Sequence, residues 1–167
     1  QGRVALRDRV GDHVSWGYYP TSPPAITGDI AVIGALVVDN LRDDAPSGVV
    51  RAFNVKTGDL VWAWDPVSED YKSRHRDENG QVRYHQGSPN VWAPMAVDHE
   101  RSLILIPTGS PSPDLYGGER DGIDEYGSSV VALDAATGGY RWHFQTVHHD
   151  VWDFDVAAQF DKVRRID

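Results

Sequence analysis

Short apolar stretches alternate with turn residues along most of the chain. The segment "SPPAITGDIAVIGALV" (22–37) holds two apolar runs around a Gly-Asp pair, and "APMAVDHERSLILIP" (93–107) holds two around "DHER". Apolar runs of this length between turn residues are typical of β-strands paired as hairpins. No segment shows a convincing 3.6-residue apolar period, and ten prolines punctuate the chain. The pattern therefore predicts an all-β fold.

A second kind of hairpin occurs twice with the same motif. The segments "VRAFNVKTGDLVWAW" (50–64) and "VVALDAATGGYRWHF" (130–144) align without gaps. Each reads as a strand, an Asx-x-x-Thr-Gly turn and a strand that ends on aromatic residues. The side chain of Asn54 or Asp134 can accept hydrogen bonds from the turn backbone, and the glycine of the Thr-Gly pair can adopt a positive φ. The two segments are therefore predicted to be copies of one hairpin.

The two kinds of hairpin follow each other in the same order twice, which gives four strands per unit. A repeating four-stranded unit is typical of a β-propeller blade. A β-sandwich also has short strands, but it does not predict the same Thr-Gly…Trp motif twice. We therefore predict a β-propeller fragment, with blades near 21–65 and 92–145 and a third starting near residue 150. Because rings use about four to eight blades, we expect residues 1–167 to be part of a larger propeller.

The same pattern predicts the individual elements. Trp62 and Trp142 lie at matching positions of the two Thr-Gly hairpins, and we expect them to dock between blades. The segment 66–90 is rich in Asp, Glu, Arg and Lys, and we expect it to be an exposed excursion. No helix longer than two turns is expected. Strands are expected near residues 24–27, 30–37, 49–54, 60–64, 94–98, 103–107, 129–134 and 140–145.

Composition excludes several classes of function. The chain has 16 Lys and Arg against 25 Asp and Glu, a formal net charge of −9, whereas nucleic-acid binding relies on clustered basic residues. There is no cysteine, so disulfides, thiolate metal sites and cysteine nucleophiles are excluded. The longest strongly apolar run, residues 30–38, is far too short to span a membrane, and the N-terminus has no signal-peptide pattern. Membrane attachment would therefore need a segment outside this chain.

The repeated motif Ala-x-Asx-x-x-Thr-Gly-x-x-x-Trp resembles the tryptophan-docking motif of quinoprotein dehydrogenases. These are eight-bladed propellers that carry pyrroloquinoline quinone (PQQ) on their axis. The combination of motifs resembles the membrane-bound quinoprotein glucose dehydrogenase branch, which includes quinate and other polyol dehydrogenases. The resemblance covers roughly residues 15–157, and the sequence after about Gln159 departs from the family pattern. Four further stretches carry it: "TSPP" (21–24), "VDNLRDDAPSGVVRAFNVKTG" (38–58), "SPNVWAP" (88–94), and "PSPDLYGGER" (111–120) with "QTVHHDVWDFD" (145–155).

The resemblance implies a PQQ-dependent oxidoreductase at the periplasmic face of the bacterial inner membrane. The expected reaction is oxidation of an aldose, glucose to gluconolactone, with electrons passed to ubiquinone. A quinate, polyol or alcohol dehydrogenase of the same superfamily is an alternative. A non-catalytic propeller scaffold, which would use the docking motif for protein contacts, is another. We expect this fragment alone to be inactive.

The stretch "HHDVWDFD" contains the expected catalytic residue. By resemblance, Asp153 matches the family's catalytic aspartate, which takes the proton from the substrate hydroxyl while hydride leaves carbon for the quinone. Without the resemblance, the cluster could be a zinc site or a polar corner of a β-protein. Zinc is disfavoured because adjacent residues on a strand, here His148 and His149, point to opposite faces.

The remaining site residues are also implied by the resemblance. Asp39 and Asn40 match the family's metal-ligand pair, although taken alone they would be an ordinary turn cap. Ser112 matches the third protein ligand, and Ser110 is a nearby alternative. Hard oxygen ligands of this kind suit Ca²⁺ or Mg²⁺.

Two positions match residues that contact the cofactor itself. Trp92 matches the tryptophan whose indole forms the floor beneath the PQQ rings, and a flat tricyclic quinone needs a broad aromatic face. Thr21 matches a hydroxyl contact to a PQQ carboxylate. A tryptophan in a β-protein is otherwise more often a core residue.

Overall fold

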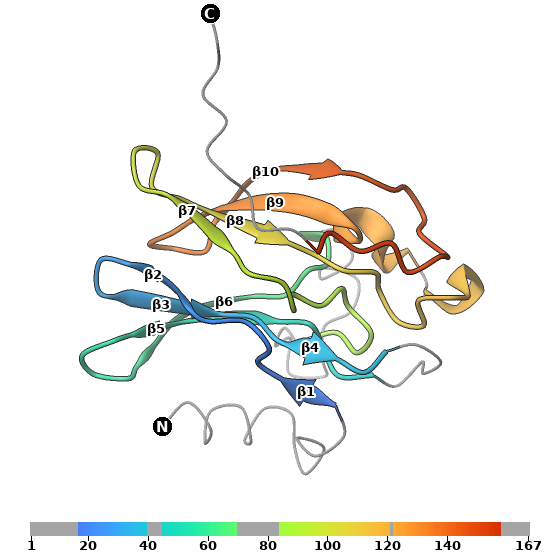
Figure 1. Cartoon of the computed structure of the whole chain (residues 1–167), viewed down its shortest axis with the longest axis horizontal. Coiled ribbons are helices and arrows are strands. Elements are labelled where there is room, and N and C mark those ends of the chain that lie inside the picture. Colours follow the sequence, from blue (N-terminus) through green and yellow to red (C-terminus); the bar gives the residue numbers. More distant parts are fainter. Residues whose placement is uncertain (1–16, 40–44, 70–83, 121, 158–167) are drawn as a thin grey trace, which may run out of the picture.

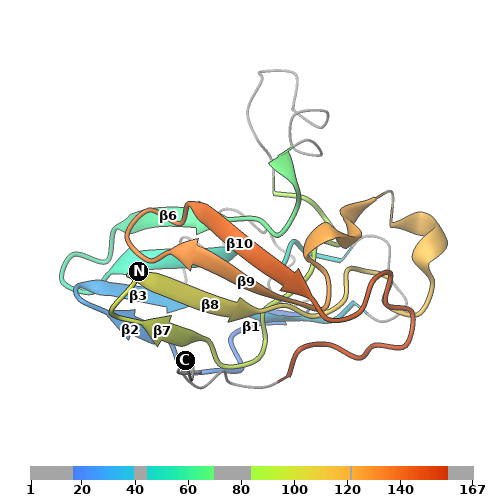
Figure 2. The same cartoon turned by 90° about the horizontal axis from the view of Figure 1, so that it is seen from above.

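Two antiparallel sheets lie face to face in the computed structural model, which describes residues 17–39, 45–69, 84–120 and 122–157 (Figures 1 and 2). The strand orders are β2-β3-β5-β6 and β7-β8-β9-β10, and β1 pairs with β4 as a separate ribbon. The strands are β1 Tyr18–Tyr19, β2 Ala25–Thr27, β3 Ile30–Ile33, β4 Leu36–Val37, β5 Val50–Asn54, β6 Leu60–Trp64, β7 Ala96–Asp98, β8 Leu103–Pro107, β9 Ser129–Asp134 and β10 Tyr140–Gln145.

The predicted all-β fold and the two four-stranded units are confirmed. In the described part of the chain the short 3-10 turns are η2 Gly117–Glu119 and η3 Ile123–Tyr126. Among the described residues, no helix is long and apolar enough to span a bilayer. The blade limits and the third blade near residue 150 stay predictions.

One predicted strand is in fact two. Residues 30–37 divide into β3, which pairs with β2 and β5, and β4, which pairs with the unpredicted β1. Gly34 lies between them, and a Cβ there would lie 2.3 Å from the Val91 carbonyl oxygen. The Val91 amide donates to the Ala35 carbonyl across 3.2 Å. The strand therefore changes partners where it passes close to the Val91 backbone.

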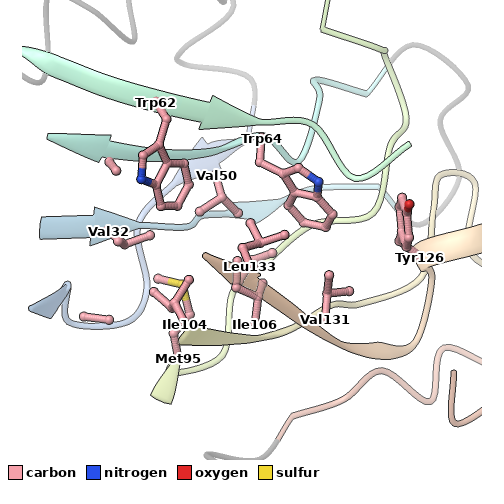
Figure 3. Close-up of a cluster of buried hydrophobic side chains, with 13 residues drawn as sticks. Val32, Val50, Trp62, Trp64, Met95, Ile104, Ile106, Tyr126, Val131 and Leu133 are labelled. Atoms are coloured by element: carbon pink, nitrogen blue, oxygen red, sulfur yellow. The ribbon is translucent and has the colours of Figure 1, made fainter. Parts of the chain in front are cut away.

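The core fills the space between the two sheets. In β8 the core residues Ile104 and Ile106 alternate with less buried ones, as the period of a β-strand requires, whereas the first four residues of β5 are all buried. The core side chains of the two sheets face one another in Figure 3. Burial of each large apolar side chain contributes about 1.5–3 kcal/mol. The core members from the two sheets include Val32, Val50, Trp62, Trp64, Ile104, Ile106, Val131 and Leu133.

Trp62 joins the first sheet to the turn of the second, as predicted. Its indole Nε1 donates to the Ala135 carbonyl across 3.1 Å. A Cβ on Gly138 would lie 2.6 Å from the Trp62 ring, and Gly138 has a φ of 70°. Glycine at this position therefore serves both the turn geometry and the close approach of the indole. The matching Trp142 is 43% exposed in this chain.

The two Thr-Gly turns have the same hydrogen bonds. Asn54 Oδ1 accepts from the amides of Lys56 and Thr57, at 2.9 and 3.1 Å. Asp134 Oδ1 accepts from the amides two and three residues further on, at 3.0 and 2.9 Å. The predicted role of the Asx residue is confirmed in both copies.

The expectation of an exposed excursion over 66–90 is wrong at its ends, and residues 70–83 lie outside the described residues. Val67 and Ser88 are 2% and 3% exposed. The carboxylate of Asp65 accepts hydrogen bonds from Ser88 Oγ at 2.7 Å and from the His85 amide at 2.5 Å. This buried carboxylate ties the start of the segment to its end, which charge composition alone did not reveal.

A buried arginine organises the long connection between β8 and β9. Arg120 is 1% exposed, and its guanidinium donates to the carbonyls of Pro113, Asp114 and Asp150. It also pairs with Asp124 Oδ1 at 3.0 Å. These contacts hold the loop 113–124 against the segment that follows β10.

We expect Gly138→Ala to destabilise the protein more than Gly28→Ala does. Both glycines have a positive φ, 70° and 55°, but a Cβ on Gly28 would meet nothing within 4 Å. The left-handed conformation costs about 1–2 kcal/mol in either variant, and displacement of Trp62 adds about 1–3 kcal/mol of overpacking. Denaturant unfolding of the two variants measures the difference. Equal losses of stability in the two variants would mean that the packing of the Trp62 indole does not require glycine at position 138.

Arg120→Ala is expected to lower the free energy of unfolding by about 3–5 kcal/mol, because it leaves buried carbonyls and a carboxylate without their donor. The matched control is Arg101→Ala. Arg101 pairs with Asp98 at 2.8 Å, but its side chain is 66% exposed, and exposed ion pairs contribute little to stability. Thermal or denaturant unfolding of both variants tests the contrast. A loss at Arg120 no larger than that at Arg101 would contradict the organising role.

Candidate active site

The segment after β10 returns to the end of β8. It runs back past the sheet in Figure 2, and the Val156 amide donates to the Thr108 carbonyl across 3.2 Å. Asp155, the residue before, accepts from the Ser110 amide through Oδ1 and from the Trp92 indole Nε1 through Oδ2, both at 2.7 Å. Two distant motifs of the sequence, "SPNVWAP" and "HHDVWDFD", therefore meet at one carboxylate.

Asp150 shapes the turn that presents Asp153. Its carboxylate accepts from the amides of Trp152 and Phe154, at 3.0 and 2.9 Å, and from Ser128 Oγ at 2.7 Å. Burial raises the pKa of the Asp150 carboxyl, but these hydrogen bonds outweigh burial and lower it overall. The carboxylate is thus held ionised at the base of the turn, and Asp153 lies between its two anchored amides.

The backbone of this turn is unusual. Three non-glycine residues within it have a positive φ: His149 at 51°, Asp153 at 58° and Asp155 at 49°. Asp and His adopt this left-handed region more readily than most residues, but three in a short segment require that the surrounding contacts hold them. Such conformations cluster at functional sites.

Asp153 lies at the solvent-exposed side of the turn and has a perturbed carboxyl. Burial, the Asp114 carboxyl and the Asp150 carboxyl together raise the pKa of Asp153. A higher pKa makes a carboxylate a stronger proton acceptor once it is ionised. A cation nearby would act in the opposite direction and keep the group ionised.

The structure brings Asp39 and Ser112 together. Ser112 Oγ donates to the Asp39 carbonyl across 2.8 Å, and Asn90 Nδ2 donates to Asp39 Oδ2 across 2.5 Å. Burial, together with the negative charge of Asp114, raises the pKa of the Asp39 carboxyl to about 7. Asn40, the other expected ligand, lies outside the described residues. Ser110, the alternative hydroxyl, instead lies beside Ser128 with 3.4 Å between the two oxygens.

The donor set at Asp39 fits a hard cation. Asn90 is 3% exposed, and its Oδ1 is buried and accepts no hydrogen bond from any residue that the structure describes. A buried amide oxygen without a donor costs free energy, and a Ca²⁺ or Mg²⁺ ion would satisfy it. No three Asp, Glu or His side chains in the described ranges form a group that could hold a metal. The ligands would therefore be mixed carboxylate, amide and hydroxyl oxygens.

The two histidines do not act as a pair. His148 Nδ1 lies 2.8 Å from Gln145 Oε1, whereas His149 Nδ1 lies 2.8 Å from Asp124 Oδ2. Their rings therefore bond to different elements. The two residues lie in a turn after β10 and not on a strand, so the alternation argument against zinc does not apply, although the rings do diverge. His149 connects the turn to Asp124, which also pairs with Arg120.

Both the backbone carbonyl and the indole nitrogen of Trp92 are hydrogen-bonded. Thr21 Oγ1 and Ser22 Oγ donate to its backbone carbonyl, at 2.8 and 2.5 Å, while its indole nitrogen donates to Asp155. The half-buried ring is a broad apolar surface in a fixed orientation, which suits a planar aromatic cofactor. Thr21 therefore lies beside Trp92, and its contact with a cofactor carboxylate stays a prediction.

The sequence did not identify every residue of this site. Asn90 and Ser22 were missed, although each lies within a quoted motif, "SPNVWAP" and "TSPP". Asp155 lies within "HHDVWDFD", and its bond to Trp92 joins segments far apart in the chain. No local pattern predicts such a contact.

The sequence is similar to quinoprotein dehydrogenases along almost its whole length. The family model described as "PQQ: Glucose/ethanol/alcohol dehydrogenase, beta-propeller domain" matches residues 1–161. The quinoprotein glucose dehydrogenase of Escherichia coli (strain K12) is 42% identical over 95% of this chain and 20% of its own length. The quinate/shikimate dehydrogenase (quinone) of Acinetobacter baylyi is 40% identical over 95% of this chain and 19% of its own length.

The fold is similar to that of a solved relative. The crystal structure of the quinohemoprotein alcohol dehydrogenase from Comamonas testosteroni superimposes with a TM-score of 0.66 at 26% sequence identity, covering 85% of this chain and 22% of that chain. The chain spans about a fifth of the length of the curated relatives it matches. The chain therefore belongs to the PQQ-dependent glucose/ethanol/alcohol dehydrogenase family and forms part of its β-propeller domain.

Proposed function

We propose that the protein containing this chain is a PQQ-dependent dehydrogenase that oxidises a sugar, with glucose to gluconolactone as the first choice. The observation that carries the proposal is the junction at Asp155. It ties the broad indole of Trp92 to the same short segment that holds the exposed carboxylate of Asp153. An aromatic floor and a proton acceptor on one anchored segment are what oxidation of an alcohol on a quinone requires.

In this proposal Asp153 is the general base. Its carboxylate accepts the proton of the substrate hydroxyl, and its raised pKa favours that transfer. PQQ, when bound, supplies the two-electron acceptor for the hydride. Trp92 would support the cofactor rings, and Thr21, which contacts the Trp92 backbone, would meet a cofactor carboxylate.

Asp39, Asn40 and Ser112 are proposed to hold Ca²⁺ or Mg²⁺. The contact between Ser112 and the Asp39 carbonyl and the buried oxygen of Asn90 support a cation at this position. A cation there would keep nearby carboxylates ionised and polarise a bound carbonyl.

The substrate, acceptor and location are proposed from the relatives. Oxidation of quinate or another polyol is the second candidate, because the quinate/shikimate relative is 40% identical and the glucose relative 42%. We propose ubiquinone as the electron acceptor and the periplasmic face of the bacterial inner membrane as the location. Attachment to that membrane would come through a segment outside this chain.

The deciding experiment is a PQQ titration of the complete protein with Ca²⁺ or Mg²⁺, followed by dye-linked turnover on glucose, quinate and glycerol. Metal-dependent PQQ binding and turnover would support the enzyme. Absence of metal-dependent binding would instead support a propeller scaffold, which needs neither an aromatic floor nor an exposed carboxylate.

Asp153→Asn should reduce turnover by about 10²–10⁴-fold, because it removes the proton acceptor and keeps the size of the side chain. PQQ and metal should still bind. His148→Asn and His149→Asn should lose less activity, because those rings bond to Gln145 and Asp124 and not to the reacting groups. Dye-linked turnover at saturating PQQ and metal checks this order. Near-normal turnover of Asp153→Asn would remove it from catalysis.

Asp39→Ala should weaken metal binding and PQQ reconstitution together, since Asp39 would hold the cation and a bound cation would supply positive charge for an anionic cofactor. Asp29→Ala is the matched control, because Asp29 is a surface residue whose side chain is 55% exposed and pairs with Lys56. Calorimetric metal titration and PQQ absorbance measure the two effects. If Asp39→Ala behaves like the control, Asp39 does not bind the metal.

A further inference from the structure

We propose that Asp155 is a positioning residue, which fixes the indole plane of Trp92 and its placement relative to Asp153. This inference rests on the proposed function, in which Trp92 is the cofactor floor. Asp155 itself does not touch the reacting atoms. It acts through the two groups that its carboxylate binds.

Each oxygen of Asp155 has one N–H donor. Oδ2 accepts from the Trp92 indole nitrogen and Oδ1 from the Ser110 amide, both at 2.7 Å. These lengths are those of charge-assisted hydrogen bonds. The Ser110 contact anchors the carboxylate to backbone at the end of β8, so the indole is held against a fixed point.

Gly109 has no side chain, and this leaves the space in which the Asp155 carboxylate lies. A Cβ on Gly109 would lie 2.7 Å from Oδ1 and 3.0 Å from Cγ of Asp155. Only glycine at this position leaves room for the carboxylate against the backbone. Gly109, Ser110 and Asp155 therefore form one binding niche for the indole N–H.

An indole ring turns about two side-chain torsions, so anchoring the backbone does not by itself fix the plane of the ring. The hydroxyls of Thr21 and Ser22 fix the carbonyl of Trp92, and the bond to Asp155 fixes the far edge of the ring. Without that bond the ring is free to tilt, and a tilted ring offers less area to a planar ligand. Asp155 also lies two residues after Asp153, so the same bond sets the distance from the floor to the proposed base.

The chemistry of the niche requires a carboxylate. Two N–H donors need two acceptors, and an asparagine offers one oxygen and one NH₂ group. Asp155→Asn would therefore leave either Trp92 or Ser110 facing another donor. It is not a conservative substitution at this position.

The test is a double-mutant cycle in the complete apo-protein. PQQ affinity is measured by absorbance titration at saturating Ca²⁺ for wild type, Asp155→Ala, Trp92→Phe and the double variant. Asp155→Ala is expected to weaken PQQ binding by about 10–150-fold, the effect of one lost charge-assisted hydrogen bond. The double variant is expected to bind no more weakly than Trp92→Phe alone, because Asp155 acts through the indole. Effects that multiply would overturn the proposal.

A second arm of the test is a measurement on the apo-protein and does not depend on the cofactor. The near-ultraviolet circular dichroism of the apo-protein contains a contribution from Trp92, defined as the difference between wild type and Trp92→Phe. Asp155→Ala is expected to remove most of that contribution, whereas the surface variant Asp29→Ala should keep it. An unchanged contribution in Asp155→Ala would contradict the proposal. Failure of the wild type to bind PQQ would instead contradict the proposed function and leave this arm valid.

Gly109→Ala tests the same contact by adding a methyl group beside the Asp155 carboxylate. The added methyl group should displace the carboxylate, and the variant should reproduce the loss of PQQ affinity and of the Trp92 signal. If Asp155→Ala does not fold, Gly109→Ala and Asp155→Asn take its place in both arms. Normal affinity and a normal signal in folded Gly109→Ala would overturn the inference.

Discussion

The close contact of the Trp62 indole with the turn at Gly138 is the constraint on which the arrangement of the sheets depends. The two four-stranded sheets are separate in the chain, and the space between them is filled by apolar side chains that have no preferred direction. The indole adds a direction, because its N–H reaches one carbonyl, that of Ala135. Hydrophobic burial supplies most of the stabilisation, and this hydrogen bond, together with the bond from the Val91 amide to the Ala35 carbonyl, restrains how the second sheet sits on the first.

In the candidate active site, hydrogen bonds to charged groups likewise fix how segments of the chain are arranged. Arg120, Asp150 and Asp155 each bind at least one group from a segment that is remote in sequence. Buried charges are costly unless their hydrogen-bonding capacity is used, so these groups hold the loops in one arrangement. The result is a rigid setting for Asp153, which remains at the surface of the turn with its carboxylate available.

The fold could be read from the sequence because its signals are local. Strand, turn and strand follow one another in the hairpins, and the Asx residue of each Thr-Gly turn bonds two and three residues ahead. The exception at Gly34 arose from contact with Val91, far along the chain. Much of the site came from the resemblance, which placed Trp92 and Asp153 in known motifs. The partners Asn90 and Asp155 could not be predicted, because their roles depend on contacts between segments that only the folded structure brings together.

Asp153 and Asp155 are two residues apart in the sequence, and this spacing constrains the site. With the proposed base and the support of the proposed floor on a stretch of three residues, an insertion or deletion there would misplace one relative to the other. The loop from Pro113 to Asp124 is under no such restriction at its exposed tip, where Leu115 and Tyr116 face solvent. Substitutions at such a tip leave the spacing of Asp153 and Asp155 unchanged. The relatives named for glucose and for quinate are about equally similar to this chain, at 42% and 40% identity.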